Sequence, residues 1–132
     1  MKITIYIFIL IFHLISKAEN VEIESMLTEH QKNQARFYSK YKNKKIASKG
    51  IVKSITAETT IERSQNALLK LPPVFLIFIN DSGSKVSCFI KDEKVATNLN
   101  INDSINYAGV INDITYSGDG IIVTNCKIKI NN

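Results

Sequence analysis

The sequence has no tryptophan and only two histidines in 132 residues. A protein metal site needs several His, Cys or carboxylate ligands close together. One histidine, His13, lies in an apolar N-terminal run, and the other, His30, has no cysteine near it in the sequence. We therefore expect no metal site and no cofactor.

Catalytic motifs are absent as well. The chain has no G-x-S-x-G motif, no Cys–His pair in a nucleophile-like position and no glycine-rich phosphate loop. Its aspartates lie mainly in expected turns, where Asp bonds to the local backbone. Arginine is also scarce, with only Arg36 and Arg63, so a nuclease site of acids and arginines around a cation is disfavoured. We expect no catalytic residues and no enzymatic activity.

The N-terminus is apolar from Ile3 to Ile15, after a single early lysine. Ser16 and Ala18 provide the small residues of a cleavage site, so residues 1–18 are predicted to be a secretory signal peptide. The run is shorter than the roughly 20 residues of a membrane span, although a retained anchor is the alternative. Cleavage would leave 15 basic and 12 acidic residues, a net charge of +3, in a protein exported to the periplasm or secreted.

The first part of the mature chain, residues 19–43, is predicted to be an N-terminal amphipathic helix. Residues 21–42 contain no glycine or proline, and their apolar positions recur near the helical period. Glutamates lie early and lysines late in this segment, the order that the helix dipole favours. The aromatic residues near its end are therefore expected to pack, with lysines at the helix C-terminus; the apolar positions are Ile23, Leu27, His30, Phe37 or Tyr38, and Tyr41.

From Lys45 the pattern alternates as in a β-strand, with Gly50 at its middle. A glycine inside a long strand usually marks a bulge or a bend. Further strands are predicted at 74–80, 85–91, 104–111 and 121–130, with turns at 81–84 and 116–120. The connection 57–73 is expected to hold a short helical turn at 66–69, and 92–99 a short helix or loop.

Five strands with a helical element between the third and fourth are typical of an OB-fold. The predicted fold is therefore mainly β: a five-stranded Greek-key barrel over residues 44–132, a single domain preceded by the amphipathic helix. The mature length suits one modest core.

The sequence resembles the tRNA_anti-like family, a group of exported bacterial OB-fold proteins named for their likeness to tRNA-anticodon-binding domains. The resemblance runs from about Asn33 to Ile130 and is carried by Asn33, Ala35, "YKNKKIASKGIVKSI", "VSCFI", "NLNINDSINYAGVI" and "VTNCKI". Asn102 stands where the family usually has glycine, and Ala47 where it usually has valine. The family implies the fold and export, and most of its members have no assigned activity.

The OB topology that the family shares bears on the two cysteines. It places the third and fifth strands side by side, with Cys88 on the third and Cys126 on the fifth. Their Cα atoms are then expected within about 5–6 Å, the range of a disulfide. A disulfide also suits an exported protein. Two buried free thiols are the alternative.

The usual OB ligand face lies on the second and third strands. On the second strand, Phe75, Ile77 and Ile79 alternate with Val74, Leu76 and Phe78. One set must enter the core, and we expect the N-terminal helix to cover the other, because large exposed apolar patches are uncommon on monomers. A basic strip across strands one to three provides candidate binding residues, with ordinary solvated lysines as the alternative: Lys44, Lys45, Lys49, Lys53, Lys85 and Lys91.

These observations predict a non-enzymatic OB-fold binding module of the bacterial cell envelope, with a protein as its partner. Single-stranded nucleic acid is one alternative ligand; it requires aromatic residues exposed on the sheet. An oligosaccharide is another, although pockets of that kind usually carry tryptophan or acids. The sequence does not identify the ligand.

Overall fold

The computed structural model describes residues 18–57, 74–115 and 118–131. Nearly all of the predicted signal peptide, the predicted helical turn at 66–69 and part of the turn at 116–120 lie outside the described residues. Within those residues, no helix is long and apolar enough to cross a membrane.

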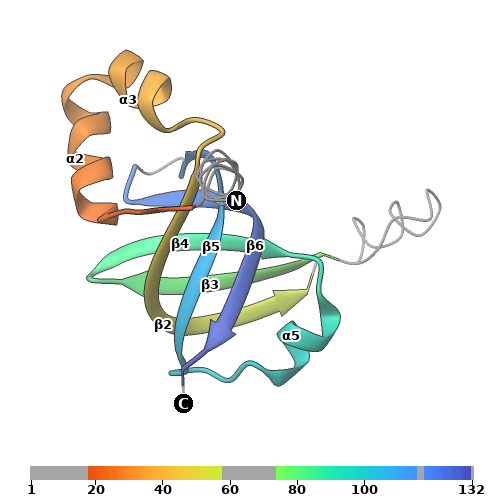
Figure 1. Ribbon diagram of the computed structural model, residues 1–132. Helices are drawn as coiled ribbons and strands as arrows, with labels where there is room; N and C mark the ends of the chain where they lie inside the picture. The colour runs from red at the N-terminus through yellow and green to blue at the C-terminus, as the bar shows by residue number, and fades with distance from the viewer. Residues whose placement is uncertain (1–17, 58–73, 116–117, 132) are drawn as a thin grey trace, which may run out of the picture.

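The order of helices and strands in the described chain is close to the one that the sequence predicts (Figure 1). All five long strands and the short helix α5 are present at the expected places. The elements are β1 (Glu19–Asn20), α2 (Ile23–Lys32), α3 (Gln34–Tyr41), β2 (Lys45–Ala57), β3 (Phe75–Asp81), β4 (Ser84–Ile90), α5 (Glu93–Asn98), β5 (Ser104–Ile114) and β6 (Gly120–Ile130).

The strands form a closed five-stranded barrel. The sheet order is β1-β2-β3-β4-β6-β5, and pairing of β2 with β5 closes it. Neighbouring barrel strands are antiparallel except β4 and β6, which are parallel. The short strand β1 adds to the start of β2. This arrangement, with α5 between β4 and β5, confirms the predicted OB-fold.

Strand β2 bends so that its two halves pair with different neighbours. Lys45–Ile51 pairs with β5, and Ile51–Ala57 pairs with β3. The register shifts between Val52 and Ser54, just beyond Gly50. A Cβ on Gly50 would lie 2.5 Å from the carbonyl oxygen of Asn80, so the glycine permits the close approach of β2 and β3 at the bend.

The N-terminal segment contains two helices where the sequence predicts one. Asn33 is extended (φ −158°, ψ 96°), and its side chain accepts a hydrogen bond from the backbone N–H of Arg36 at 3.0 Å. Asparagine is a favoured helix N-cap because its side chain satisfies a free backbone N–H. The chain therefore ends α2 and begins α3 at this residue.

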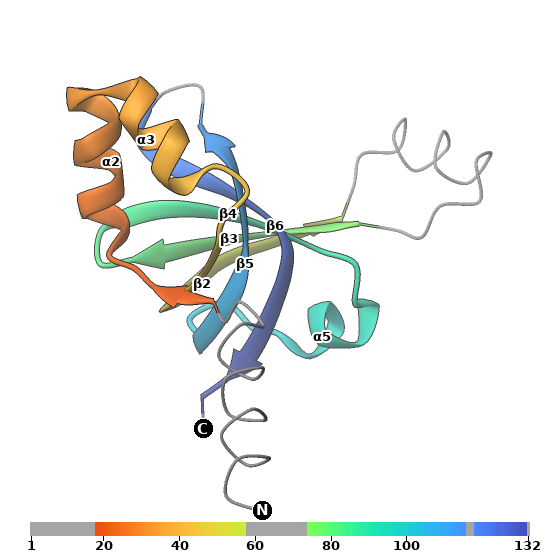
Figure 2. The same ribbon diagram turned by 45° about the horizontal axis from the view of Figure 1, so that its top comes forward.

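The two helices cap one end of the barrel, and α5 lies at the other end (Figure 2). Ile23, Met26 and Phe37 are fully buried and belong to the same apolar core as the inward side chains of the strands. Tyr38 adds a hydrogen bond of 2.9 Å to Asp113 at the end of β5. The predicted packing role of these helix residues is thus confirmed, with Met26 as an additional member.

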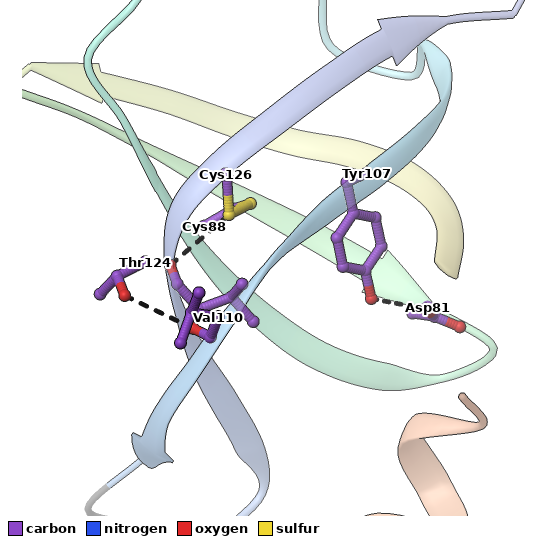
Figure 3. Close-up of a disulfide and its surroundings, with 7 residues drawn as sticks. Asp81, Cys88, Tyr107, Val110, Thr124 and Cys126 are labelled. Atoms are coloured by element: carbon purple, nitrogen blue, oxygen red, sulfur yellow. Dashed lines mark hydrogen bonds between the residues drawn. A yellow bond between two sulfur atoms is a disulfide. The ribbon is translucent and has the colours of Figure 1, made fainter. Parts of the chain in front are cut away.

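Cys88 of β4 and Cys126 of β6 form a disulfide, as the OB topology implies. Their Cα atoms are 5.8 Å apart, and both side chains are buried. Figure 3 shows the bridge running between the two parallel strands. The alternative of two free thiols is therefore excluded.

Candidate functional site

The outward side of β3 and β4 is a continuous surface, which we call the β3–β4 face. Ile77 and Ile79 point into the core, so the residues of β3 that alternate with them point outward. Cross-strand pairing then sets Leu76 beside Phe89, Phe78 beside Ser87 and Asn80 beside Lys85. Ser54 and Thr56 of β2 extend the same surface, because they pair with Phe78 and Leu76.

Two phenylalanines lie diagonally across this face. Phe78 and Phe89 are half-buried and, unlike Phe75, do not belong to the residues packed against the core. The side chain of Lys85 is exposed, and its Nζ lies 5.2 Å from the centre of the Phe78 ring. A cation over an aromatic ring is an attractive arrangement. The face therefore combines flat apolar surfaces with an exposed positive charge.

The prediction that the N-terminal helix covers the outward side of β3 is wrong. Helix α2 packs against α3 and β6, while α3 reaches the end of β5 through Tyr38 and Asp113. The reason is that the apolar stripe of the helices fills the open end of the barrel, where Phe37 becomes fully buried. Leu76 and Phe78 are left outside both the core and this helical cap.

The six predicted lysines do not form one strip. Lys53 lies at the β2 bulge, between residues paired with Ile79 and Phe78, and so adjoins the β3–β4 face with Lys85. Lys45 and Lys49 lie on the first half of β2, opposite β5. Two others lie outside the strands: Lys44 immediately before β2, and Lys91 immediately after β4.

Sequence reasoning missed three residues at the surfaces of the barrel. Phe89 is the first, although "VSCFI" alternates and an inward Cys88 requires an outward Phe89. Lys127 and Lys129 are the others, on alternate positions of β6. Both lysines pair with β5, beside the first half of β2.

A buried polar cluster lies inside the barrel near the helical cap. The hydroxyl of Tyr107 donates to Asp81 Oδ2 at 2.7 Å, and Ser48 Oγ donates to the same oxygen. Burial, followed by the hydrogen bond to Asp81, holds the pKa of Tyr107 well above its usual value. Because the cluster joins β2, β3 and β5, and its Tyr107 and Asp81 are buried, we assign it a structural role.

A second carboxylate lies at the surface near the helices. The backbone N–H of Ile114 and then the hydroxyl of Tyr38 lower the pKa of Asp113. Across the described ranges, no three His, Cys, Asp or Glu side chains gather in a group able to hold a metal ion. The β3–β4 face is therefore the candidate site. Its residues are suited to binding a ligand through apolar contact and electrostatic attraction.

No family model matches this chain, and no curated protein matches it. Its structure is similar to a solved structure from Klebsiella pneumoniae that is described as a "putative nucleic acid-binding lipoprotein". The TM-score is 0.62 at 14% sequence identity, over 85% of this chain and 92% of that one. At this identity the likeness supports the fold, and the resemblance to the tRNA_anti-like family stays a prediction beyond the shared barrel.

Proposed function

We propose that this protein is an extracytoplasmic, non-enzymatic module that binds single-stranded nucleic acid on the β3–β4 face. The observation that carries the proposal is the outward pair of phenylalanines, Phe78 and Phe89, on the two strands that form the usual OB ligand surface. Bases of any sequence stack on aromatic rings, and flanking lysines attract the phosphates. Lys53 and Lys85 provide those charges here.

Three further observations support it. A solved structure with a similar fold is described as a "putative nucleic acid-binding lipoprotein". Helices α2 and α3 do not pack on Leu76 and Phe78, which answers the objection that the N-terminal helix would block this face. The disulfide supports a location outside the cytoplasm, where such bonds persist. An envelope protein as partner stays a prediction, and it is an outcome of the tests below.

The binding test uses purified protein and a fluorescently labelled oligothymidine, followed by fluorescence anisotropy. We expect binding that weakens as salt rises, with a slope of log K against log [salt] of about −0.7 for each phosphate contacted. Duplex DNA of the same length should bind more weakly, because its bases are stacked on one another. A neutral oligosaccharide should not compete.

The test of the site replaces the aromatic rings. Phe78→Leu and Phe89→Leu keep an apolar side chain but remove the flat surface, and each should weaken binding by about 1–3 kcal/mol per lost stack. Leu76→Ala is the matched control, since it removes apolar volume from the same face without removing a ring.

The proposal fails if no oligonucleotide binds at low salt, or if both leucine variants bind as well as the original protein. Competition by an oligosaccharide, or recovery of an envelope protein with no nucleic acid after cross-linking in cells, would favour the other ligands.

A further inference from the structure

A second concave surface lies on the outward side of the first half of β2, β5 and β6. Pairing places Lys49, Asn106 and Lys129 in one row across the three strands. Ala47, Ala108 and Lys127 form the neighbouring row, and Asn20 of β1 lies beside Ala47. We call this surface the lysine groove, and the residues of its two rows are Asn20, Ala47, Lys49, Asn106, Ala108, Lys127 and Lys129.

The groove is hollow because its floor consists of small side chains. Ala47 and Ala108 face each other across β2 and β5, while the larger Tyr107 points into the core. The resulting depression has a volume of about 620 Å³ and is open to solvent. The three lysines are exposed around it, with Asn106 between Lys49 and Lys129. A polar chain can therefore lie over the alanines with cations beside it.

Among the described residues, none of the three groove lysines forms an ion pair. In the part of the chain that the structure describes, both ion pairs involve Glu29 of α2. Strands lie about 4.8 Å apart, so the Cα atoms of Lys49 and Lys129 are separated by about 10 Å, and those of Lys127 and Lys129 by about 7 Å. Three like charges at this spacing favour a ligand that carries several negative charges.

Strand β2 connects this groove to the β3–β4 face. Lys49 lies on its first half and Lys53 at the bulge of its second half, about 13 Å further along the strand. In Figure 1 the first half of β2 crosses in front of β3 and β4 together with β5 and β6, so the two surfaces belong to different sides of the barrel. A flexible polymer that passes around the bend of β2 from one surface to the other would meet Lys53 on its way.

From this arrangement we infer that the lysine groove binds the sugar-phosphate backbone of the same single strand whose bases stack on the β3–β4 face. The inference rests on the proposed function and extends it, since it assigns a longer path around β2. The groove has no aromatic side chain outward in its two rows, so it contacts phosphates and is indifferent to base identity. A single-stranded polymer fits both surfaces because it is flexible and charged along its length.

The experiment compares short and long oligothymidines, spanning the range of about 4 to about 16 nucleotides that OB-folds occupy. Affinity should rise with length beyond the shortest probe that reaches Phe78 and Phe89. The triple variant Lys49→Gln, Lys127→Gln, Lys129→Gln should lose this gain. Its salt slope for the long probe should fall by about 2, since each phosphate contact to a single strand contributes about 0.7. Binding of the shortest probe should change little.

The matched control removes the same amount of charge elsewhere. Lys32→Gln, Lys42→Gln, Lys94→Gln alters lysines of α2, of the end of α3 and of α5 that do not line the groove, and it should keep the length dependence. If this control loses the same affinity as the groove variant, the effect is one of net charge and the inference is wrong. Urea unfolding of both variants checks that each is folded.

Other outcomes separate the inference from the function on which it rests. Binding that requires Phe78 and Phe89 but does not increase with length overturns the groove and leaves the proposed function intact. Failure of every oligonucleotide to bind overturns both. Vesicles of phosphatidylglycerol provide the remaining arm. Binding to these vesicles that requires the groove lysines, with no effect of those lysines on oligonucleotides, would assign the groove to a lipid surface instead.

Discussion

Cys88 and Cys126 are joined at the point where the ladder between β4 and β6 ends. The parallel pairing of these strands runs from Lys85 with Gly120 to Cys88 with Val123. Cys126 lies three residues beyond that last pair, so the disulfide holds the two strands together where their backbone pairing stops. The disulfide thus links β4 to β6 beyond their last paired residues.

Removal of this disulfide should cost much of the stability of the domain. The two cysteines are 38 residues apart, for which the chain-entropy model gives about 4 kcal/mol. Urea unfolding of Cys88→Ala, Cys126→Ala should therefore show a large fall in the unfolding free energy. A reductant should destabilise the original protein and leave the double variant unchanged. An equal unfolding free energy with and without reductant would contradict a stabilising bridge.

The hydroxyl of Tyr107 should contribute through its hydrogen bond to the buried Asp81. Tyr107→Phe preserves the ring but removes one of the two side-chain donors that Asp81 has among the described residues, at a cost of about 1–3 kcal/mol. Tyr38→Phe is the control, because its hydrogen bond to Asp113 is at the surface and should matter less. Chemical denaturation of the two variants measures both effects. Equal losses would show that burial of Asp81 adds nothing.

Tyr107 should also make the protein sensitive to alkali. Burial raises the pKa of Tyr107 in the folded state, whereas the pKa of tyrosine in an unfolded chain is about 10. The folded state therefore keeps a proton that the unfolded state loses, and stability should be complete below about pH 10 and fall as the pH rises above it. Unfolding free energies measured across this range should fall less steeply for Tyr107→Phe. The same slope in both proteins would argue against this residue as the source.

Gly50→Ala should destabilise the barrel at the bend of β2. The added Cβ would lie 2.5 Å from both the Asn80 carbonyl oxygen and Ile79 Cγ2, so β2 and β3 must separate. Overpacking of this kind typically costs about 1–3 kcal/mol. Ser54→Ala, on the same strand, is the control because a Cβ is already present there. Thermal unfolding compares the two, and a Gly50 variant as stable as the original protein would contradict the close approach.

Local pattern was enough for most of the elements. The change of period at Lys45, the turns and the alternation within each strand predicted β2 to β6 and α5, because side-chain periodicity follows directly from backbone geometry. In the sequence, the break between α2 and α3 was visible only as the polar pair Asn33 and Gln34 within the apolar stripe. The break forms because the Asn33 side chain accepts a hydrogen bond from the Arg36 N–H, an alternative that is close in free energy to one continuous helix.

The candidate site was less predictable. The alternation of β3 limits its inward residues to one of two sets, but it does not say what covers the other. The helical stripe could pack on that set or on the barrel end, and both choices bury Phe37. Lys49, Lys127 and Lys129 come from strands far apart in the sequence, so no local pattern brings them into one groove.

The sequence alone determined the order of the strands and the position of the short helix, and through the OB topology it favoured the pairing of Cys88 with Cys126, which the structure then showed. These follow from periodicity and from the small number of ways in which five such strands close. Only the tertiary structure decided where the helices pack, which phenylalanines stay outside and which lysines meet. Those outcomes depend on which of several distant apolar segments becomes buried at each position, and only the packing of the whole barrel decides this.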